Sequence, residues 1–378
     1  MIRISLLLRI FDSAYMQRWN DKPRPIEFIE LDKQAHKMVI AYVLGKLEEE
    51  NGGISWIEII EGGIFELLQR IVVTDLKPPI FYKIKSDPEK YETLRKNVVK
   101  EWEQLISNMD DEFFQRFNDY FSNYEETKNK KILEYAHLKA SYWEFKFIKN
   151  INPGGFEIED VEKNLIDQIE RYSELECVKS LSAKPSILKF IDLCAQLRFQ
   201  ARWSNLHRIP KTSVLGHSLF VAIMSYLFSL TNGASHERTF NNYFTGLFHD
   251  LPEVLTRDII SPVKRSIPGL DELIKKYEKE EMDIIYKLVP EEWHKELGLF
   301  CENEFEDITD PSNGELIRDG DIIKACDHLA AFIEAREAIK NGCSSINFQE
   351  TLITLRNEYD RRNIKDINFG ELYADLML

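Results

Sequence analysis

The feature that most constrains this sequence is a repeat, because the second half carries motifs of the first half in the same order. Arg18-Trp19 recurs as Arg202-Trp203, and His36 recurs as His217. Two longer sets of residues match at constant offsets. At an offset of 183 residues, Gly63-Ile64-Phe65, Asp75 and Pro79 match Gly246-Leu247-Phe248, Asp258 and Pro262. At an offset of 191 residues, His137-Leu138 and Ile148-Lys149-Asn150 match His328-Leu329 and Ile339-Lys340-Asn341. Four matches in one order predict a tandem duplication, in which each half is one structural unit.

The hydrophobic pattern of both halves is helical. Apolar residues recur mainly three and four positions apart, as at Leu7, Ile10 and Ala14, and alternating strand patterns are scarce. The segment Leu219–Leu230 is apolar almost throughout. Since twelve residues cannot span a bilayer, this segment is expected to form a buried central helix. The predicted fold class is all-α, with two tandem helical bundles.

The length also favours two units, because 378 residues exceed the usual size of one domain. The stretch Ser180–Pro185 follows a charged amphipathic run from Glu157 to Glu176 and ends in a proline. We therefore place the boundary there and predict domains at residues 1–178 and 185–378.

Composition excludes several classes of protein. A net charge of -15 argues against general binding to nucleic acid, which depends on clustered Lys and Arg. The apolar stretch Ile4–Ile10 is interrupted by Arg9 and resembles neither a signal peptide nor a membrane span. Five widely spaced cysteines form no CxxC pair, which favours a reducing, cytoplasmic setting.

The residues that carry chemistry lie in the second half. His249-Asp250 can place an imidazole nitrogen and a carboxylate oxygen on one ion if the pair sits near a helix end, where the backbone is free to turn. His217, just before the expected buried helix, and Asp327, within an apolar helical segment, are the best further candidates. This mixed nitrogen and oxygen set suits a first-row or borderline divalent ion and leaves positions open for water and substrate.

Each of these residues alone is more often structural. A single histidine on an apolar helix is usually a satisfied core residue, and Asp327 can pair with Lys324. A buried, unpaired aspartate is costly, however, unless a cation compensates its charge. The prediction of a metal site therefore depends on the joint pattern.

The order His, His-Asp, Asp resembles the HD-domain superfamily of metal-dependent phosphohydrolases, and the spacing resembles its YfbR-like 5'-deoxynucleotidase group. The matching motifs cover roughly residues 200–335: Arg202-Trp203-Ser204, His217-Ser218-Leu219, His249-Asp250 with Glu253 and Asp258, Pro262-Val263-Lys264, and Ala325 with Asp327. The resemblance implies that His217, His249, Asp250 and Asp327 bind the metal. It also implies that Glu253 helps to activate water, and that Arg202, Trp203 and Asp258 shape a nucleotide pocket. One departure is Gly216, where relatives often carry an acidic residue.

These residue types also account for phosphate-ester hydrolysis on chemical grounds. A single divalent ion, whether Mn, Co, Ni, Zn, Mg or Fe, lowers the pKa of bound water and polarises a phosphoryl oxygen. Glu253 would share a helical face with the His-Asp pair and hold or deprotonate that water, with Asp250 beside it. Arg202 can grip a phosphate, Trp203 can stack on a base or exclude a 2'-hydroxyl, and Lys264 is a further phosphate ligand.

The predicted function is therefore hydrolysis of (deoxy)nucleoside 5'-monophosphates, with a small nucleotide or other phosphate ester as the partner. Other HD activities stay open: hydrolysis of nucleoside triphosphates, cyclic nucleotides or alarmone-type pyrophosphates. So does a non-catalytic nucleotide-binding or scaffold protein, although the presence of Glu253 argues against it.

The first half lacks this set of residues. In the sequence comparison His249-Asp250 becomes Glu66-Leu67, Glu253 becomes Arg70, and Asp327 becomes Ala136. Residues 1–178 are therefore predicted to form a degenerate HD-like domain without a metal site. Such a copy can serve as a built-in partner, so we expect an intrachain pseudo-dimer or a homo-oligomer.

Overall fold

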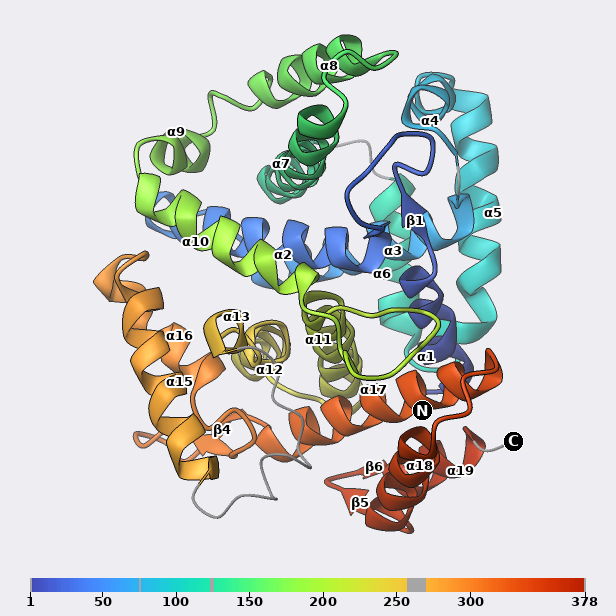
Figure 1. The fold of residues 1–378 in the computed structure, drawn as a ribbon, viewed down its shortest axis with the longest axis vertical. Coiled ribbons are helices and arrows are strands. Elements are labelled where there is room, and N and C mark those ends of the chain that lie inside the picture. Colours follow the sequence, from blue (N-terminus) through green and yellow to red (C-terminus); the bar gives the residue numbers. More distant parts are fainter. Residues whose placement is uncertain (1, 75, 123–125, 257–269, 377–378) are drawn as a thin grey trace.

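The computed structural model describes residues 2–74, 76–122, 126–256 and 270–376, and most of these residues are in helices (Figure 1). The helices of the first half are α1 (Ile4–Phe11), α2 (Glu30–Glu48), α3 (Trp56–Val73), α4 (Pro78–Lys85), α5 (Pro88–Ile106), α6 (Asp111–Ser122), α7 (Lys128–Ile151), α8 (Ile158–Glu170) and α9 (Glu176–Ser182). Those of the second half are α10 (Pro185–Gln196), α11 (Val214–Thr231), α12 (His236–Phe248), α13 (Glu253–Thr256), α15 (Leu270–Tyr286), α16 (His294–Cys301), α17 (Gly320–Lys340), α18 (Ile346–Tyr359) and α19 (Phe369–Asp375). The all-α prediction is confirmed.

The strands of the described residues form three short antiparallel pairs that fasten loops. The pairs are β1 (Gln17–Arg18) with β2 (Phe28–Ile29), β3 (Ile308–Thr309) with β4 (Leu316–Arg318), and β5 (Asn363–Ile364) with β6 (Ile367–Asn368). Strands of two or three residues bury little surface of their own, so the helices supply the core.

Several helices begin where a polar side chain can accept a hydrogen bond from the first turn. Ser55, Thr127, Ser213 and Ser235 cap α3, α7, α11 and α12 in this way. Proline occupies the first position of other helices, as Pro185 does in α10. Both features satisfy or remove backbone donors that a helix start leaves without partners.

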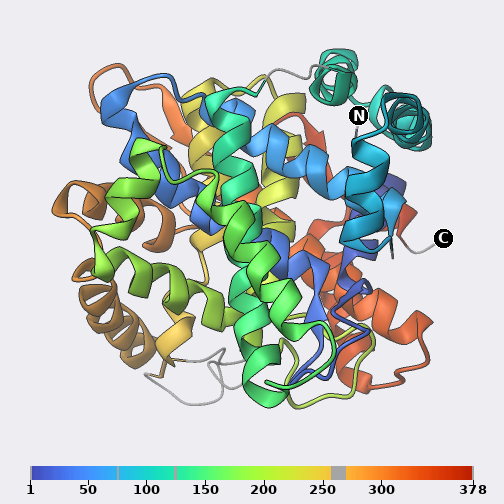
Figure 2. The same cartoon turned by 90° about the horizontal axis from the view of Figure 1, so that it is seen from above.

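Two helices, α2 and α11, form the centre of the molecule and pack against each other. Figure 1 shows α2 crossing the middle with α10 alongside it, and Figure 2 shows α7 running across the same region in the view from above. α2 also contacts α7 and α9, while α11 contacts α12 and α17. Buried apolar side chains from both halves make one continuous cluster.

The apolar run predicted as a buried helix is α11, and the burial is confirmed because nearly every side chain of Val214–Thr231 is buried. Among the described residues this is the one helix whose length and composition would allow it to cross a membrane. The helix begins at Val214, so His217 lies in the first turn and not ahead of the helix as expected. The predicted boundary between residues 178 and 185 falls within α9 and the turn before α10.

Candidate metal centre

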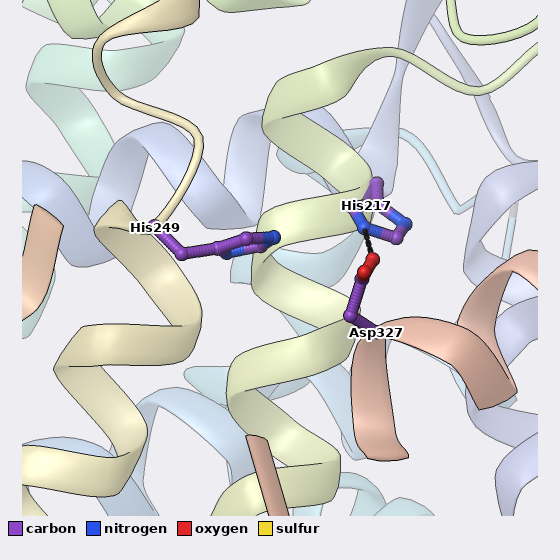
Figure 3. A group of neighbouring side chains, drawn as sticks. All are labelled: His217, His249 and Asp327. Atoms are coloured by element: carbon purple, nitrogen blue, oxygen red, sulfur yellow. Dashed lines mark hydrogen bonds and ion pairs between the residues drawn. The ribbon is translucent and has the colours of Figure 1, made fainter. Parts of the chain in front are cut away.

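Three helices bring the predicted ligands together. His217 lies in the first turn of α11, His249 is the residue directly after α12, and Asp327 lies in α17 (Figure 3). The His-Asp dipeptide thus sits at a helix end, which is the condition stated above for both residues to bind one ion. α12 can approach α11 closely because Gly246 has no side chain: a Cβ there would lie 2.7 Å from the Ala222 Cα.

The ligand atoms of His217, His249 and Asp327 all lie within 4.8 Å of one another. The Nε2 of His217 is 2.9 Å from Oδ1 of Asp327, and the ring of His249 points from the end of α12 toward α11 (Figure 3). The centroids of the two histidine rings are 5.7 Å apart. Two imidazoles and a carboxylate at this separation match the donor types that first-row divalent ions prefer.

The orientation of His249 leaves one ring nitrogen for a ligand. Its Nδ1 is 2.9 Å from the carbonyl oxygen of Gly246, a geometry in which Nδ1–H donates and Nε2 carries the lone pair. Nε2 is buried and has no hydrogen-bond partner among the described residues. Because a buried polar atom without a partner is costly, this nitrogen fits a bound cation.

Asp250 lies beside this triad. Its Oδ2 is 3.3 Å from Nε2 of His249 and 3.9 Å from a terminal nitrogen of Arg202. The same oxygen is buried and accepts no hydrogen bond from the described part of the chain. A cation at the triad would therefore find a second unsatisfied ligand atom next to His249.

The electrostatics of the triad favour a charged carboxylate. Burial alone would raise the pKa of Asp327, but the hydrogen bond and charge of His217, together with His249 and Arg202, bring this pKa below its ordinary value. The pKa of His217 is raised: burial and Arg202 oppose the imidazolium, and the hydrogen bonds to Asp327 and Glu334 outweigh them. The site thus attracts positive charge to the place where the ligands converge.

The sequence did not single out Glu334, which organises the polar side of the site. This carboxylate on α17 is fully buried and accepts hydrogen bonds from Arg202 Nε at 3.2 Å, Trp203 Nε1 at 2.9 Å and Thr212 Oγ1 at 2.6 Å. It also lies 3.2 Å from Arg208 and 3.7 Å from Nδ1 of His217. Its place two helical turns after Asp327, on the same face of the helix, was the available signal.

Arg202 lies 3.9 Å from Asp250, and both Arg202 and Trp203 bond to Glu334; the nucleotide pocket that they are expected to shape stays a prediction. Trp203 adopts a left-handed backbone with φ 57°, which aims its indole at Glu334. Its ring packs 5.2 Å from that of Phe348 in α18. The pair is thus held by α17 and α18, and Arg202 extends toward Asp250.

The remaining predicted residues follow His249. Glu253 begins the separate helix α13, so the expectation that it shares a helical face with the His-Asp pair is wrong; α12 ends at Phe248, and a turn intervenes. Gln200 Nε2 donates to the Glu253 carbonyl oxygen at 2.9 Å and fixes the start of α13. Asp258 and Lys264 lie outside the described residues.

Comparison with known proteins agrees with this geometry. The family described as HD domain matches residues 194–367. A 5'-deoxynucleotidase of Vibrio parahaemolyticus serotype O3:K6 is 28% identical over 151 residues, which are 39% of this chain and 73% of the relative. 5'-Deoxynucleotidases of Vibrio atlanticus and Pectobacterium atrosepticum are 25% and 23% identical, with 39% and 43% of this chain and 73% and 77% of the relatives covered.

Proposed function

We propose that residues 194–367, which belong to the HD-domain family, form the site of a metal-dependent phosphatase that removes phosphate from (deoxy)nucleoside 5'-monophosphates. The observation that carries this proposal is the convergence of His217, His249 and Asp327 within 4.8 Å beside Arg202 and Trp203. The 5'-deoxynucleotidase relatives support the same substrate class.

In this proposal His217, His249, Asp250 and Asp327 hold one divalent ion. The buried Nε2 of His249 and Oδ2 of Asp250, both without hydrogen-bond partners among the described residues, support the assignment. When bound, the ion would lower the pKa of a water molecule and polarise a phosphoryl oxygen. The identity of the ion is open among Mn, Co, Ni, Zn, Mg and Fe.

The chain's own groups would bind the ester and move the proton. Glu253, which begins α13 directly after the turn that follows His249-Asp250, would accept a proton from the attacking water. The Arg202 guanidinium, already 3.9 Å from Asp250 and braced by Glu334, neutralises the phosphate beside the ligands.

Trp203 would form the wall of the sugar and base pocket. The bond from its Nε1 to Glu334 and its packing on Phe348 fix the indole, so the wall is rigid. A fixed ring can exclude a 2'-hydroxyl by shape, which favours deoxynucleotides. Asp258 and Lys264 stay predictions as further substrate contacts.

The alternatives differ in their demands on the site. A two-metal phosphodiesterase would need further ligands, but the described residues contain one cluster of three His, Cys, Asp or Glu side chains suited to a metal. This supports a monoesterase over two-metal hydrolysis of cyclic nucleotides, while hydrolysis of pyrophosphates or triphosphates stays an alternative that the substrate panel decides. A cytoplasmic location stays a prediction; all five cysteines are buried and unpaired.

The test uses the full-length chain stripped with chelator and reloaded separately with Mn²⁺, Co²⁺, Ni²⁺, Zn²⁺, Mg²⁺ or Fe²⁺. Phosphate release is measured from deoxynucleoside and nucleoside 5'-monophosphates, and in parallel from triphosphates, cyclic nucleotides and pyrophosphates. We expect release from monophosphates and its loss in His249→Ala. The matched control is His236→Ala, because His236 is the exposed first residue of the same helix.

Two outcomes would contradict the proposal. Release from a different substrate class alone would replace the monoesterase by another HD activity. No release with any metal, combined with nucleotide binding that His249→Ala does not alter, would leave a binding or scaffold protein.

A further inference from the structure

We infer that residues 1–178 are a second copy of the fold of residues 185–378, in which Lys33 and His137 occupy the places of the ligands His217 and Asp327. The first half would then be a permanent partner within the same chain. At the position where the second half is proposed to bind a metal ion, the first half would have the hydrogen-bonded side chains of Lys33 and His137. The evidence is a series of equivalent contacts in the two halves.

The loops before α2 and α11 have the same construction. Gln17 pairs with Ile29 in the first half, and Ala201 pairs with Ser213 in the second, so the step along the chain from Gln17 to Ala201 equals the step from Ile29 to Ser213. The tryptophan inside each loop, displaced by the same step, has a left-handed backbone, with φ 55° at Trp19 and 57° at Trp203. Non-glycine residues rarely adopt this conformation, so its recurrence at equivalent positions is specific.

Each loop is braced by a buried glutamate in the same way. Glu144 on α7 accepts hydrogen bonds from Trp19 Nε1 at 2.8 Å and from Arg18 Nε at 2.9 Å. These are the contacts that Trp203 and Arg202 make with Glu334 on α17. The two glutamates therefore occupy equivalent positions, which aligns α7 with α17.

In each half, a glycine lies where the following helix, α3 or α12, packs on the central helix, α2 or α11. A Cβ on Gly63 of α3 would overlap the side chain of Met38, and a Cβ on Gly246 of α12 would lie 2.7 Å from Ala222. The step from Met38 to Ala222 is the one that relates the two loops. Thus α3 meets α2 at the position at which α12 meets α11, although Gly246 faces backbone and Gly63 faces a side chain.

The contacts between the halves are reciprocal. The ring of Tyr42 in α2 packs against that of Phe244 in α12, with centroids 5.0 Å apart, and Tyr226, its equivalent in α11 by the same step, donates to Glu61 of α3 at 2.5 Å. Glu61 is the counterpart of Phe244 by the step from Gly63 to Gly246. Equivalent positions also meet each other: a Cβ on Gly216 would overlap Oδ1 of Asp32, which is the counterpart of Gly216 in α2. Exchange of equivalent contacts is the mark of twofold packing, here within one chain.

The same alignments identify the counterpart of the metal site. His217 corresponds to Lys33 in α2 by the step that relates the loops, and Asp327 corresponds to His137 in α7 by the step that relates the two glutamates. Lys33 Nζ forms a hydrogen bond with Nδ1 of His137, as His217 does with Asp327. The sequence comparison had paired His217 with His36 and Asp327 with Ala136. His36 instead packs its ring against Trp143, with centroids 5.2 Å apart, and the step between the two glutamates pairs Asp327 with His137 and not with Ala136.

The residues around Lys33 and His137 disfavour the binding of a metal ion. Glu66, the counterpart of His249, is engaged by Lys37 at 2.7 Å and by Tyr120 at 2.8 Å, and Leu67 replaces Asp250. Lys33 and Lys37 are fully buried, so their side-chain nitrogens fill the place where a cation would sit, and burial lowers the pKa of Lys33. Burial and the neighbouring lysines also hold the pKa of His137 well below its ordinary value.

The experiment exchanges the equivalent residues in the full-length chain. The restored variant carries the side chains of the second half at five positions of the first: Lys33→His, Lys37→Val, Glu66→His, Leu67→Asp and His137→Asp. Its matched control has Lys33→Ala in place of Lys33→His and is otherwise identical. Metal per chain is measured by elemental analysis after loading with Mn²⁺ or Co²⁺ and removal of free ions.

We expect the restored variant to hold one more ion per chain than the unaltered protein, whatever number the unaltered protein holds, and the control to hold no extra ion. This difference separates the inference from the proposed function, which concerns the ion at His217. A folded restored variant without the extra ion would overturn the inference.

A reciprocal variant covers the case in which five buried changes prevent folding. His217→Lys combined with Asp327→His places the Lys33–His137 pair in the second half, and this protein should fold with a melting temperature that chelator does not alter. If neither variant folds, the positions are not interchangeable and the equivalence is refuted.

Discussion

Glu334→Gln should weaken both the fold and the binding of substrate. The carboxylate is 1% exposed and lies 3.2 Å from Arg208, which is 2% exposed, so the substitution leaves a buried guanidinium without its charged partner. Breaking a buried pair costs about 3–5 kcal/mol, and glutamine keeps one acceptor oxygen. We therefore expect the free energy of unfolding to fall by about 3 kcal/mol, at the lower end of that range.

The same change should lower activity, because Arg202 and Trp203 lose the group that orients them. Removing a residue that orients groups at a metal site typically costs roughly 10–100-fold in activity or metal affinity. Since Arg202 is proposed to bind the phosphate, the loss should appear mainly as a higher KM. The measurements are denaturant unfolding of the metal-loaded chain and phosphate release over a range of substrate concentrations.

Glu144→Gln is the matched control, because Glu144 is equally buried and bonds Trp19, Arg18 and Arg198. It should cost a similar amount of stability and leave KM within about twofold, a margin that is small beside the roughly 10–100-fold loss expected at a group that orients the site. If the two variants have equal KM values, Glu334 does not position substrate-binding groups and the reasoning is refuted.

Three further predictions concern other parts of the structure. Chelation should lower the melting temperature of the native chain but not of Asp327→Ala, since an ion at about 100 times its Kd contributes about 2.7 kcal/mol; equal shifts would place the ion elsewhere. Gly246→Ala should destabilise the chain by about 1–3 kcal/mol in denaturant unfolding, because the new methyl group meets the Ala222 backbone and not a movable side chain; an unchanged midpoint would contradict this. Burial raises the pKa of Asp32 from 3.8 to about 6, against the opposing effects of Arg198 and Ser213, so its contribution to stability is full below pH 3.8 and is lost as pH rises through 6. Asp32→Asn should therefore gain about 1 kcal/mol relative to the native chain between about pH 5 and pH 7.5, and a constant difference would show that the carboxyl group does not titrate there.

The helical class and the ligands could be predicted because each leaves a local signal. The run Leu219–Leu230 has no charged residue, and a helix without a polar face must be buried, as α11 is. His249 and Asp250 follow each other where α12 ends, and this turn places Oδ2 of Asp250 3.3 Å from Nε2 of His249, beside the triad.

Other parts of the site depend on contacts that sequence spacing does not reveal. Counting three residues from Asp250 placed Glu253 on the same helix, but α12 ends at Phe248 and Glu253 begins α13. Glu334 is one of many glutamates in the sequence, and its spacing of two helical turns from Asp327 becomes informative only with its burial among Arg202, Trp203 and Arg208.

The repeat shows most clearly where sequence reasoning stops. Identical letters led to the pairing of His217 with His36, whereas the hydrogen bonds and strand pairs align His217 with Lys33. When one copy of a duplicated domain loses its activity, the residues of the active site are the ones expected to change. An alignment of the two halves by identical residues therefore fails at the site itself. Residues that support the fold keep the alignment, because their partners are still present.

The contacts that the two halves share therefore distinguish residues that stabilise the fold from residues that serve catalysis. Both halves keep an arginine and a tryptophan bonded to a buried glutamate, although the described residues of the first half contain no cluster of metal ligands. If the buried glutamate served catalysis alone, there would be no reason for the first half, which has Lys33 in place of a ligand, to keep it. The glutamate must therefore hold the loop in both halves, and only in the second half does the held arginine also face the ligands. It follows that the stability cost of removing the glutamate should be common to the two halves, while the cost in KM should belong to Glu334.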